Sequence, residues 1–359
     1  MRSNPVPLIA ALLFLSLSPK AQEVSRYSLQ LSSGTFVPAE NISKERINEF
    51  SRNAAQVSGK SFTVIQFEQI PTEQQKQELK LRGVELLDYI PNYAYTAVIA
   101  AMPDETILRQ VKVRSVFELS AHQKMQPALA AGNFPARAVK VAGTADVWIS
   151  FPRSFTFEEV SNELRKRNFD ILSSDLKGYR IIALRVAVQR LGELALLPCI
   201  EYVQAVPGED VPLSFFWPNW GKDGMRVSLL NAPLSQGGKN LKGSGVVIGI
   251  GDDSDPQPHP DFTNRITSRA ATGYFPPYGH GVHVSGIAAG AGIVNEIRTG
   301  FAPKASIVSK VNSNIFINAP AYVADYGMVI TNNSYGNIVN DCSNFGVYDL
   351  YSRVLDQQA

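Results

Sequence analysis

The first half of this 359-residue sequence contains an internal repeat, and the repeat limits the folds that the chain can adopt. Residues 61–119 and residues 144–206 show the same order of segments. Each has an alternating apolar strand, a helix that follows a threonine and begins with acidic residues, two strands, a second helix and a short closing strand. This β-α-β-β-α-β order predicts two α+β ferredoxin-like units, each an antiparallel sheet with both helices on one face.

From Gly245 onward the pattern changes to that of an α/β unit. The continuous apolar run Val246–Ile250 predicts a parallel strand that is buried on both faces. The elements expected after it are a helix from His280, a strand over 305–311, a helical stretch over 319–326 and a strand over 328–332. Residues 225–359 therefore predict a doubly wound parallel sheet, in which ligands bind at the carboxyl ends of the strands.

Three further segments separate these units. Residues 22–60 form an N-terminal segment before the first repeat. Residues 120–143 are rich in alanine, glycine and proline, which predicts a flexible connector. Residues 207–224 are rich in proline and begin a stretch that we interpret as a linker and processing region within reach of a protease.

The first 21 residues have the outline of a signal peptide. A basic Arg2 precedes an apolar run from Val6 to Leu17, and small and polar residues follow up to a predicted cleavage after Ala21. The run is shorter than the ~20 residues that span a bilayer, and we expect no stable membrane span. These features predict a protein that is secreted or held at the cell surface.

The composition is not that of a disordered or fibrous protein. With 45% hydrophobic and 18% charged residues the chain has the composition of a globular protein, and a net charge of +2 gives no reason to expect nucleic-acid binding. Two cysteines, Cys199 and Cys342, are too few for a disulfide framework, and whether they pair is left open.

Residues that can carry chemistry gather in two places, Asp252 at the end of the predicted strand and the segment Gly279–Gly286 with His280 and His283. Three interpretations compete: a metal site of both histidines and Asp252, an Asp–His pair that activates a nucleophile, and histidines that only begin a helix. The helix after His280 is built of small residues that allow close packing against a sheet. This favours an imidazole held beside a carboxylate.

Four sequence blocks then resemble subtilisin-like serine proteases, the subtilase or S8 peptidase family. They are Val246–Phe262 with its Asp and His-Pro-Asp, Gly279–Gly286, Gly300–Ala305 and Asn332–Gly336. In that family the histidine of the His-Pro pair follows the catalytic aspartate by seven positions, and counting back from His259 gives Asp252 rather than Asp253.

The resemblance implies roles for individual residues. His280 would be the general base, Asp252 would orient it, and His283 would be structural. Ser334 and Gly336 would belong to the strand that pairs with the substrate backbone. The resemblance implies no metal ion or cofactor in catalysis, and the sequence shows no acidic cluster typical of a structural calcium site.

The nucleophile has no counterpart in these residues. No Gly-Thr-Ser block and no Gly-x-Ser-x-Gly elbow is present, and the sequence ends within the helix-like segment Tyr348–Gln358. We therefore expect an N-terminal fragment of a secreted serine endopeptidase, inactive by itself. The alternatives are a non-catalytic binding or inhibitory pseudoprotease and, third, a metallohydrolase.

By the same resemblance, the second repeat corresponds to the inhibitory propeptide of the family. We expect residues 144–206 to dock on the peptidase unit, and cleavage to fall within 207–224. The first repeat is interpreted as an additional pro-module or a retained binding domain. The expected partners are protein or peptide substrates and this intramolecular propeptide.

Overall fold

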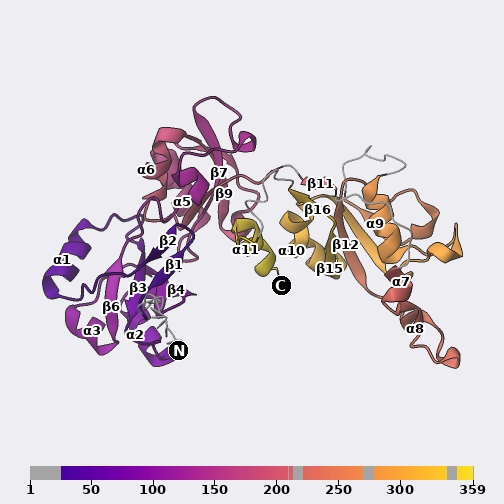
Figure 1. The fold of residues 1–359 in the computed structure, drawn as a ribbon, viewed down its shortest axis with the longest axis horizontal. Helices are drawn as coiled ribbons and strands as arrows, with labels where there is room; N and C mark the ends of the chain where they lie inside the picture. The colour runs from indigo at the N-terminus through magenta and orange to yellow at the C-terminus, as the bar shows by residue number, and fades with distance from the viewer. Residues whose placement is uncertain (1–25, 209, 213–220, 270–278, 338–345, 359) are drawn as a thin grey trace, which may run out of the picture.

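The computed structural model describes residues 26–208, 210–212, 221–269, 279–337 and 346–358, and the chain is shown in Figure 1. The predicted signal peptide, Cys342 and half of the predicted processing region lie outside the described residues. Among the helices in the described ranges, none combines the length and the hydropathy needed to cross a lipid bilayer.

The first repeat has the predicted ferredoxin-like fold. Its elements are β3 (Ser61–Phe67), α2 (Glu73–Leu81), β4 (Val84–Ile90), β5 (Ala94–Ile99), α3 (Glu105–Gln110) and β6 (Val113–Phe117). The strands pair antiparallel in the order β4-β5-β3-β6. Before it, β1 (Leu29–Leu31) and β2 (Gly34–Phe36) form a hairpin, and α1 (Lys44–Asn53) follows.

The second repeat has the same topology. It contains β7 (Thr144–Ser150), α5 (Phe157–Lys166), β8 (Asp170–Ser173), β9 (Ile181–Ala187), α6 (Leu191–Ala195) and β10 (Tyr202–Ala205). Its strand order, β10-β7-β9-β8, corresponds strand by strand to that of the first sheet. The α+β prediction for both repeats is confirmed.

The threonines that mark the helix starts form capping boxes at matching positions. The Thr156 side chain accepts a hydrogen bond from the Glu159 amide at 3.1 Å, and the Glu159 carboxylate accepts one from the Thr156 amide at 2.8 Å. Thr72 and Gln75 form the same reciprocal pair at the start of α2. These bonds satisfy amide groups that the first helical turn leaves without partners.

The segment between the repeats is packed, so the expectation of a flexible connector is wrong for its described core. It contains the short helix α4 (Pro127–Ala130), and Leu129 and Ala138 are buried. The Gln126 amide donates to the carbonyl of Val203 at 2.8 Å, which ties the segment to the edge of the second sheet. Alanine and proline here serve close packing, which a pattern of small residues does not distinguish from a loose linker.

The C-terminal unit contains the predicted parallel sheet. Its main elements are β12 (Val247–Asp252), β13 (Ile266–Ser268), α9 (His280–Ala289), β14 (Ser306–Val311), α10 (Asn314–Tyr326), β15 (Met328–Asn333) and α11 (Leu350–Asp356). The strand order is β13-β14-β12-β15, and each adjacent pair is parallel. Two short helices, α7 (Gly221–Gly224) and α8 (Val227–Asn231), precede the sheet.

Helices cover both faces of this sheet, as the doubly wound prediction requires. On β14, Ile307 packs in the cluster that contains Val284 of α9, while its neighbour Val308 packs in the cluster that contains Ile315 of α10. Figure 1 shows α9 and α10 on opposite sides of the strands. The two helices that follow β13 and β14 therefore sandwich the strand ends between them.

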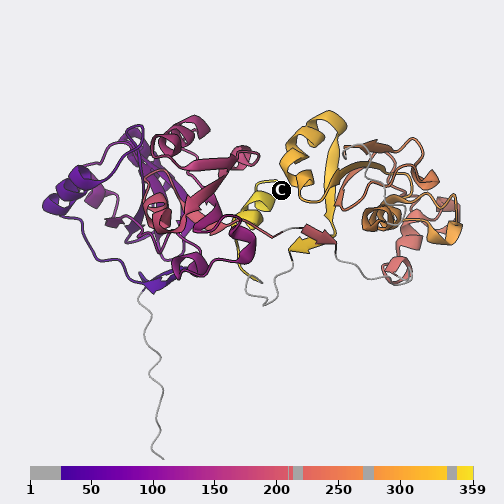
Figure 2. The same cartoon turned by 90° about the horizontal axis from the view of Figure 1, so that it is seen from above.

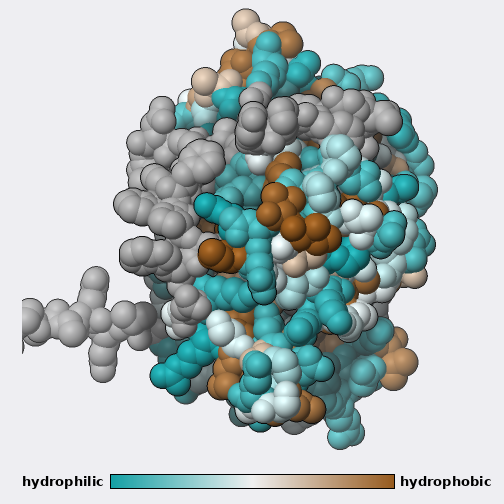
Figure 3. Space-filling view, turned by 90° about the vertical axis from the view of Figure 1, so that its right-hand side faces the viewer, coloured by the Kyte–Doolittle hydropathy of each residue, from teal (hydrophilic) through white to brown (hydrophobic). Residues whose placement is uncertain are grey.

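The C-terminal unit presents many large apolar side chains to solvent. Figure 3 shows hydrophobic residues scattered among hydrophilic ones on one face of the molecule. The exposed apolar side chains of the C-terminal unit include Leu234, Ile293, Ile297 and, on the edge strand β15, Val329. In the second repeat the exposed large apolar side chains are Leu172 and Leu196, and both are less exposed than these four. The two units thus differ clearly in how completely their apolar residues are covered.

One buried cation lies where the repeats meet. Lys124 is 3% exposed, its ammonium donates to the Leu197 carbonyl at 3.3 Å, and it lies 5.2 Å from the centre of the Phe62 ring. Burial lowers the pKa of Lys124 to about 8 from 10.5. The charged ammonium is therefore unfavourable in the folded protein, because a neutral carbonyl and a ring compensate only part of its lost hydration.

We predict that the Lys124→Met variant abolishes one component of the pH dependence of stability. As pH rises from 7 to 9.5, the folded chain releases the Lys124 proton before the unfolded chain does, so the natural protein gains about 2 kcal/mol that the variant does not gain. Urea unfolding across this pH range measures the difference. Lys140→Met, at an exposed position, is the control that retains the natural slope. Equal slopes in the natural protein and in Lys124→Met would contradict the prediction.

Candidate active site

Asp252 lies at the carboxyl end of the central strand β12, the edge where a doubly wound sheet binds its ligands. Its side chain is buried, and the strand approaches its neighbours closely at the preceding residue. A Cβ atom on Gly251 would lie 2.6 Å from the Ile315 side chain and 2.7 Å from the Asn312 carbonyl oxygen. Only glycine fits there, and it lets α10 support the strand end from behind.

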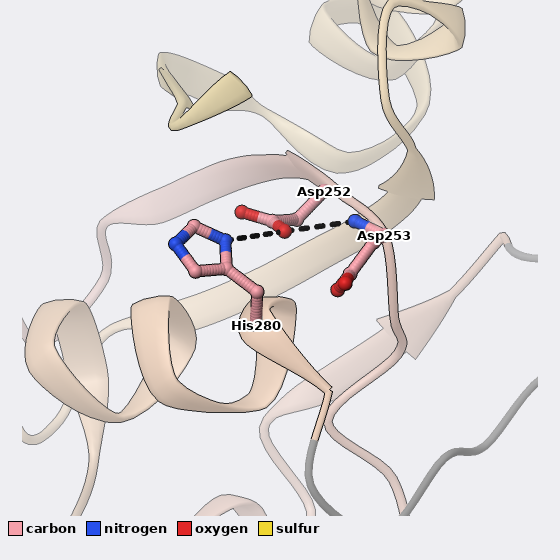
Figure 4. Close-up of side chains that lie close together, drawn as sticks. All are labelled: Asp252, Asp253 and His280. Carbon is pink, nitrogen blue, oxygen red and sulfur yellow. Dashed lines mark hydrogen bonds and ion pairs between the residues drawn. The ribbon is translucent and has the colours of Figure 1, made fainter. Parts of the chain in front are cut away.

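His280 is the first residue of α9, and its ring faces Asp252 across the sheet edge (Figure 4). The imidazole Nδ1 and the carboxylate Oδ1 are 2.8 Å apart. The Asp252 side chain is 0% exposed and that of His280 14%. Burial raises the pKa of Asp252 above its usual value, and the hydrogen bonds from His280 and from the Asp253 amide offset part of that effect.

The small residues of α9 allow this contact. A Cβ atom on Gly281 would lie 2.1 Å from the carbonyl oxygen of Ser254 and 3.0 Å from the Cβ of Asp252. Further along the helix, a Cβ on Gly300 of the following loop would lie 2.6 Å from the Gly286 carbonyl oxygen. Larger side chains would move the helix away from β12, and His280 would lose its contact with Asp252.

The neighbouring acid, Asp253, has a different environment. One of its carboxylate oxygens accepts hydrogen bonds from the Gly281 amide at 2.9 Å and from the Ser254 hydroxyl at 2.8 Å. Its own amide donates to Asp252 Oδ1 at 2.8 Å. The Asp253 carboxylate therefore binds the first turn of α9, and the Asp253 amide orients the Asp252 carboxylate. Asp252 is the acid that contacts the histidine ring.

The structure gives the metal interpretation a different set of residues from the one that the sequence suggested. Within the described part of the chain, one group of three side chains offers ligand atoms within 4.8 Å of one another, namely Asp252, Asp253 and His280. His283 is not in it and lies exposed on α9. In this group the Nδ1 atom of His280 already bonds to Asp252, an arrangement that suits an oriented base.

The two predicted substrate-binding residues lie just beyond β15. Ser334 receives a hydrogen bond on its hydroxyl from the Asn332 side chain at 2.9 Å. Gly336 lies in the short strand β16 (Tyr335–Asn337), which pairs antiparallel with β11 (Asp210–Pro212), and Gly336 is opposite Val211. A strand from the predicted processing region thus lies along the predicted substrate-binding strand (Figure 2).

Asp210 holds this strand in place, and the sequence analysis did not identify it. Its carboxylate accepts a hydrogen bond from the Ser313 amide at 3.0 Å, where α10 begins. An acid at that end of a 13-residue helix is favoured by the helix dipole. A lone acid in a proline-rich segment carries no signal for such a contact, because Ser313 is distant in the sequence.

Comparisons with known proteins agree with the resemblance in the C-terminal unit. Residues 243–357 match the subtilase family, and this range contains Asp252, His280, Ser334 and Gly336. Residues 30–120 match a domain of unknown function, DUF8729. No curated protein matches the chain.

Solved structures of proteases are also similar to this chain. One is fervidolysin from Fervidobacterium pennivorans, a keratinolytic enzyme related to subtilisin, with 15% identity and a TM-score of 0.41 over 60% of this chain. Another is the epidermin leader peptide processing serine protease from Staphylococcus aureus, with 14% identity and a TM-score of 0.41 over 60% of this chain. The match spans 38% of the fervidolysin chain and 56% of the Staphylococcus chain.

We predict that Asp252 and not Asp253 accepts the hydrogen bond from the Nδ1–H group of His280. In Asp252→Asn the charged acceptor at Nδ1 is lost, so the downfield Nδ1 proton resonance of His280 should disappear from the NMR spectrum. In Asp253→Asn the resonance should persist, because the amide oxygen can still accept from Gly281. The assignment would be wrong if the two variants behaved in the opposite way.

Proposed function

We propose that this chain carries the propeptide and the acid–base half of a secreted subtilisin-like serine endopeptidase. The observation that supports this most directly is the buried 2.8 Å contact between Asp252 and His280 within the part of the chain that matches the subtilase family. A predicted signal peptide and the packing of the second repeat, described below, fit the same proposal.

In the proposed mechanism His280 takes the proton of a serine hydroxyl and later delivers it to the leaving amine. Since Nδ1 faces Asp252, the proposal assigns this exchange to Nε2. Asp252 fixes the tautomer and stabilises the imidazolium that forms, and its burial strengthens that interaction. Asp253 is proposed as a positioning residue through its bond to Gly281.

The serine is the part of the triad that these 359 residues do not supply in a recognisable block. We propose that the serine lies outside these residues, so that they do not cleave peptides by themselves. Ser334 is assigned instead to the strand that pairs with the substrate backbone, together with Gly336.

The packing of the second repeat supports its role as an inhibitory propeptide. The face of its sheet opposite α5 and α6 contacts the helices of the C-terminal unit (Figure 2). The Trp148 ring stacks on Tyr351 of α11 with centroids 6.1 Å apart and planes 5° from parallel. The Tyr179 hydroxyl donates to the Phe316 carbonyl in α10 at 3.1 Å.

Polar contacts at the same interface fix the first turn of α11. The Gln204 side chain accepts a hydrogen bond from the Leu350 amide at 2.9 Å. Glu201 and Arg353 form an ion pair at 2.7 Å with side chains 10% and 19% exposed. The acceptor on the second repeat thus satisfies a helix amide that lacks an intrahelical partner.

Strand β11 completes the proposed inhibition. It pairs with β16 as an added strand, and its main chain occupies hydrogen-bonding groups that a substrate would use. Cleavage within residues 207–224 would then separate the inhibitor from the peptidase unit. We propose that this cleavage takes place after export, in the extracellular space or at the cell surface.

Active-site labelling of the longer gene product tests the catalytic proposal. The coding sequence downstream of residue 359 is determined, the full product is expressed, and it is treated with a fluorophosphonate probe. We expect a Gly-Thr-Ser block and a labelled serine, with labelling at least 1,000-fold slower in His280→Ala.

The other outcomes of this experiment distinguish the alternatives. A stop codon directly after residue 359, with peptide binding retained, would replace the proposal with a non-catalytic pseudoprotease. Hydrolysis that resists the probe and is lost with a chelator would instead indicate a metallohydrolase.

We predict that Trp148→Ala loosens the docking of the second repeat. Losing the stack on Tyr351 should cost about 2 kcal/mol, which raises the exchange rates of the α11 amides roughly 30-fold in hydrogen–deuterium exchange. Trp148→Phe preserves an aromatic contact and serves as the matched control. The docking role of this face would be refuted by unchanged α11 exchange in Trp148→Ala.

A further inference from the structure

The first repeat has a sheet that is buried on both faces, although its own helices cover only one of them. Every residue of β3 is buried. Ile65 and Phe67 pack with Leu79 of α2 and Leu108 of α3 in a core that also takes in Ile47 of α1 and contains no residue of the second repeat. The opposite face of the sheet must therefore be covered by something else.

The second repeat covers that opposite face. Phe62 and Val64 of β3 and Ala94 and Val98 of β5 belong to one continuous apolar cluster with residues of the second repeat. The members from α5, α6 and the loop after α6 include Val160, Leu164, Leu191, Leu194 and Leu197. The helical side of the second repeat is therefore sealed by the sheet of the first.

Polar contacts join the same two surfaces. The Lys60 ammonium donates to the Ser154 carbonyl at 2.7 Å and pairs with Glu159 at 2.9 Å, and it lies 4.7 Å from the centre of the Phe155 ring. Main-chain pairing adds to this, since the Phe62 amide donates to the Pro198 carbonyl at 2.8 Å.

Three side-chain contacts involve the first turn of α5 or the loop before it. Glu159 is the capping-box residue of α5. Lys60, the residue directly before β3, therefore binds the group that caps a helix in the second repeat. On the β4 side, Arg153 donates to the Leu86 carbonyl at 3.1 Å, and Ser154 donates to Glu85. The N-terminal end of α5 and the loop before it are therefore fixed by the first repeat.

We propose that the first repeat, which matches a domain of unknown function, is the structural partner that keeps the second repeat folded as an inhibitor. The two repeats form one cooperative folding unit over residues 27–206, and the second repeat unfolds whenever the first does. The inhibitory role of the second repeat rests on the proposed function, but the cooperative unfolding of the two repeats does not. The role assigned to the first repeat is thus regulatory: its integrity sets how long the docking sheet persists.

A matched pair of leucines on helix α2 tests this proposal in the full chain. Leu79 is 0% exposed and lies in the core that contains no residue of the second repeat, and Leu81, two positions later, is 89% exposed. Leu79→Ala should speed hydrogen–deuterium exchange of the slowest amides in β3 by on the order of 100-fold. The proposal expects the same factor for the slowest amides of β7 and β9, which Leu79 does not reach. Leu81→Ala should change neither set.

A milder variant keeps the test valid where Leu79→Ala does not fold. Lys60→Met removes the ammonium that joins Ser154 and Glu159, and exchange in β3 and β7 should then rise together by about 5-fold. Acceleration confined to β3, with β7 and β9 unchanged, in either variant would overturn the proposal, because the repeats would then unfold independently.

These measurements are separate from the test of the proposed function. Exchange coupling between the repeats needs no serine nucleophile and no hydrolysis. Failure of the fluorophosphonate experiment would leave the coupling intact, and failure of the coupling would leave the assignment of Asp252 and His280 intact.

Discussion

A four-stranded ferredoxin-like sheet covers only one of its faces with its own helices, and the arrangement of this chain follows from how the other face is covered. The first repeat places its free face on the helices of the second repeat. The second repeat places its free face on α10 and α11 of the C-terminal unit. Alternation along β7 shows the division: Val147 and Ile149 point into the shared core of the repeats, and Trp148 between them points at α11.

Local patterns in the sequence predicted the elements and sheet topologies well. Thr72 and Thr156 identify helix starts because a side-chain oxygen and an acid or amide three residues later satisfy free amides, and that chemistry is local. The packing of residues 120–143 was not predictable in the same way. Leu129 and Ala138 are buried by residues far away in sequence, and small residues suit a tight interface as well as a loose linker.

The candidate site was predictable to the extent that its geometry is set by one strand and one helix. Asp252 and His280 meet because Gly281 lets the start of α9 lie close to the end of β12, and this glycine is part of the Gly279–Gly286 segment of the sequence. Asp252 contacts the His280 ring and Asp253 contacts the Gly281 amide, and the catalytic roles of both acids stay a prediction. The contact of Asp210 depends on the amide of Ser313, which lies 103 positions later, and no local pattern indicates it.

In the proposed function, the pairing of β11 with β16 also determines how inhibition depends on dilution. While the chain is continuous, the second repeat and its strand are tethered beside the site at an effective concentration on the order of millimolar, whatever the concentration of the protein. Once the chain is cut after β11, the same contacts become bimolecular, and the fraction of blocked sites falls as the solution is diluted. Under the same proposal, a single cleavage would convert a concentration-independent block into one that export into a large volume is enough to release.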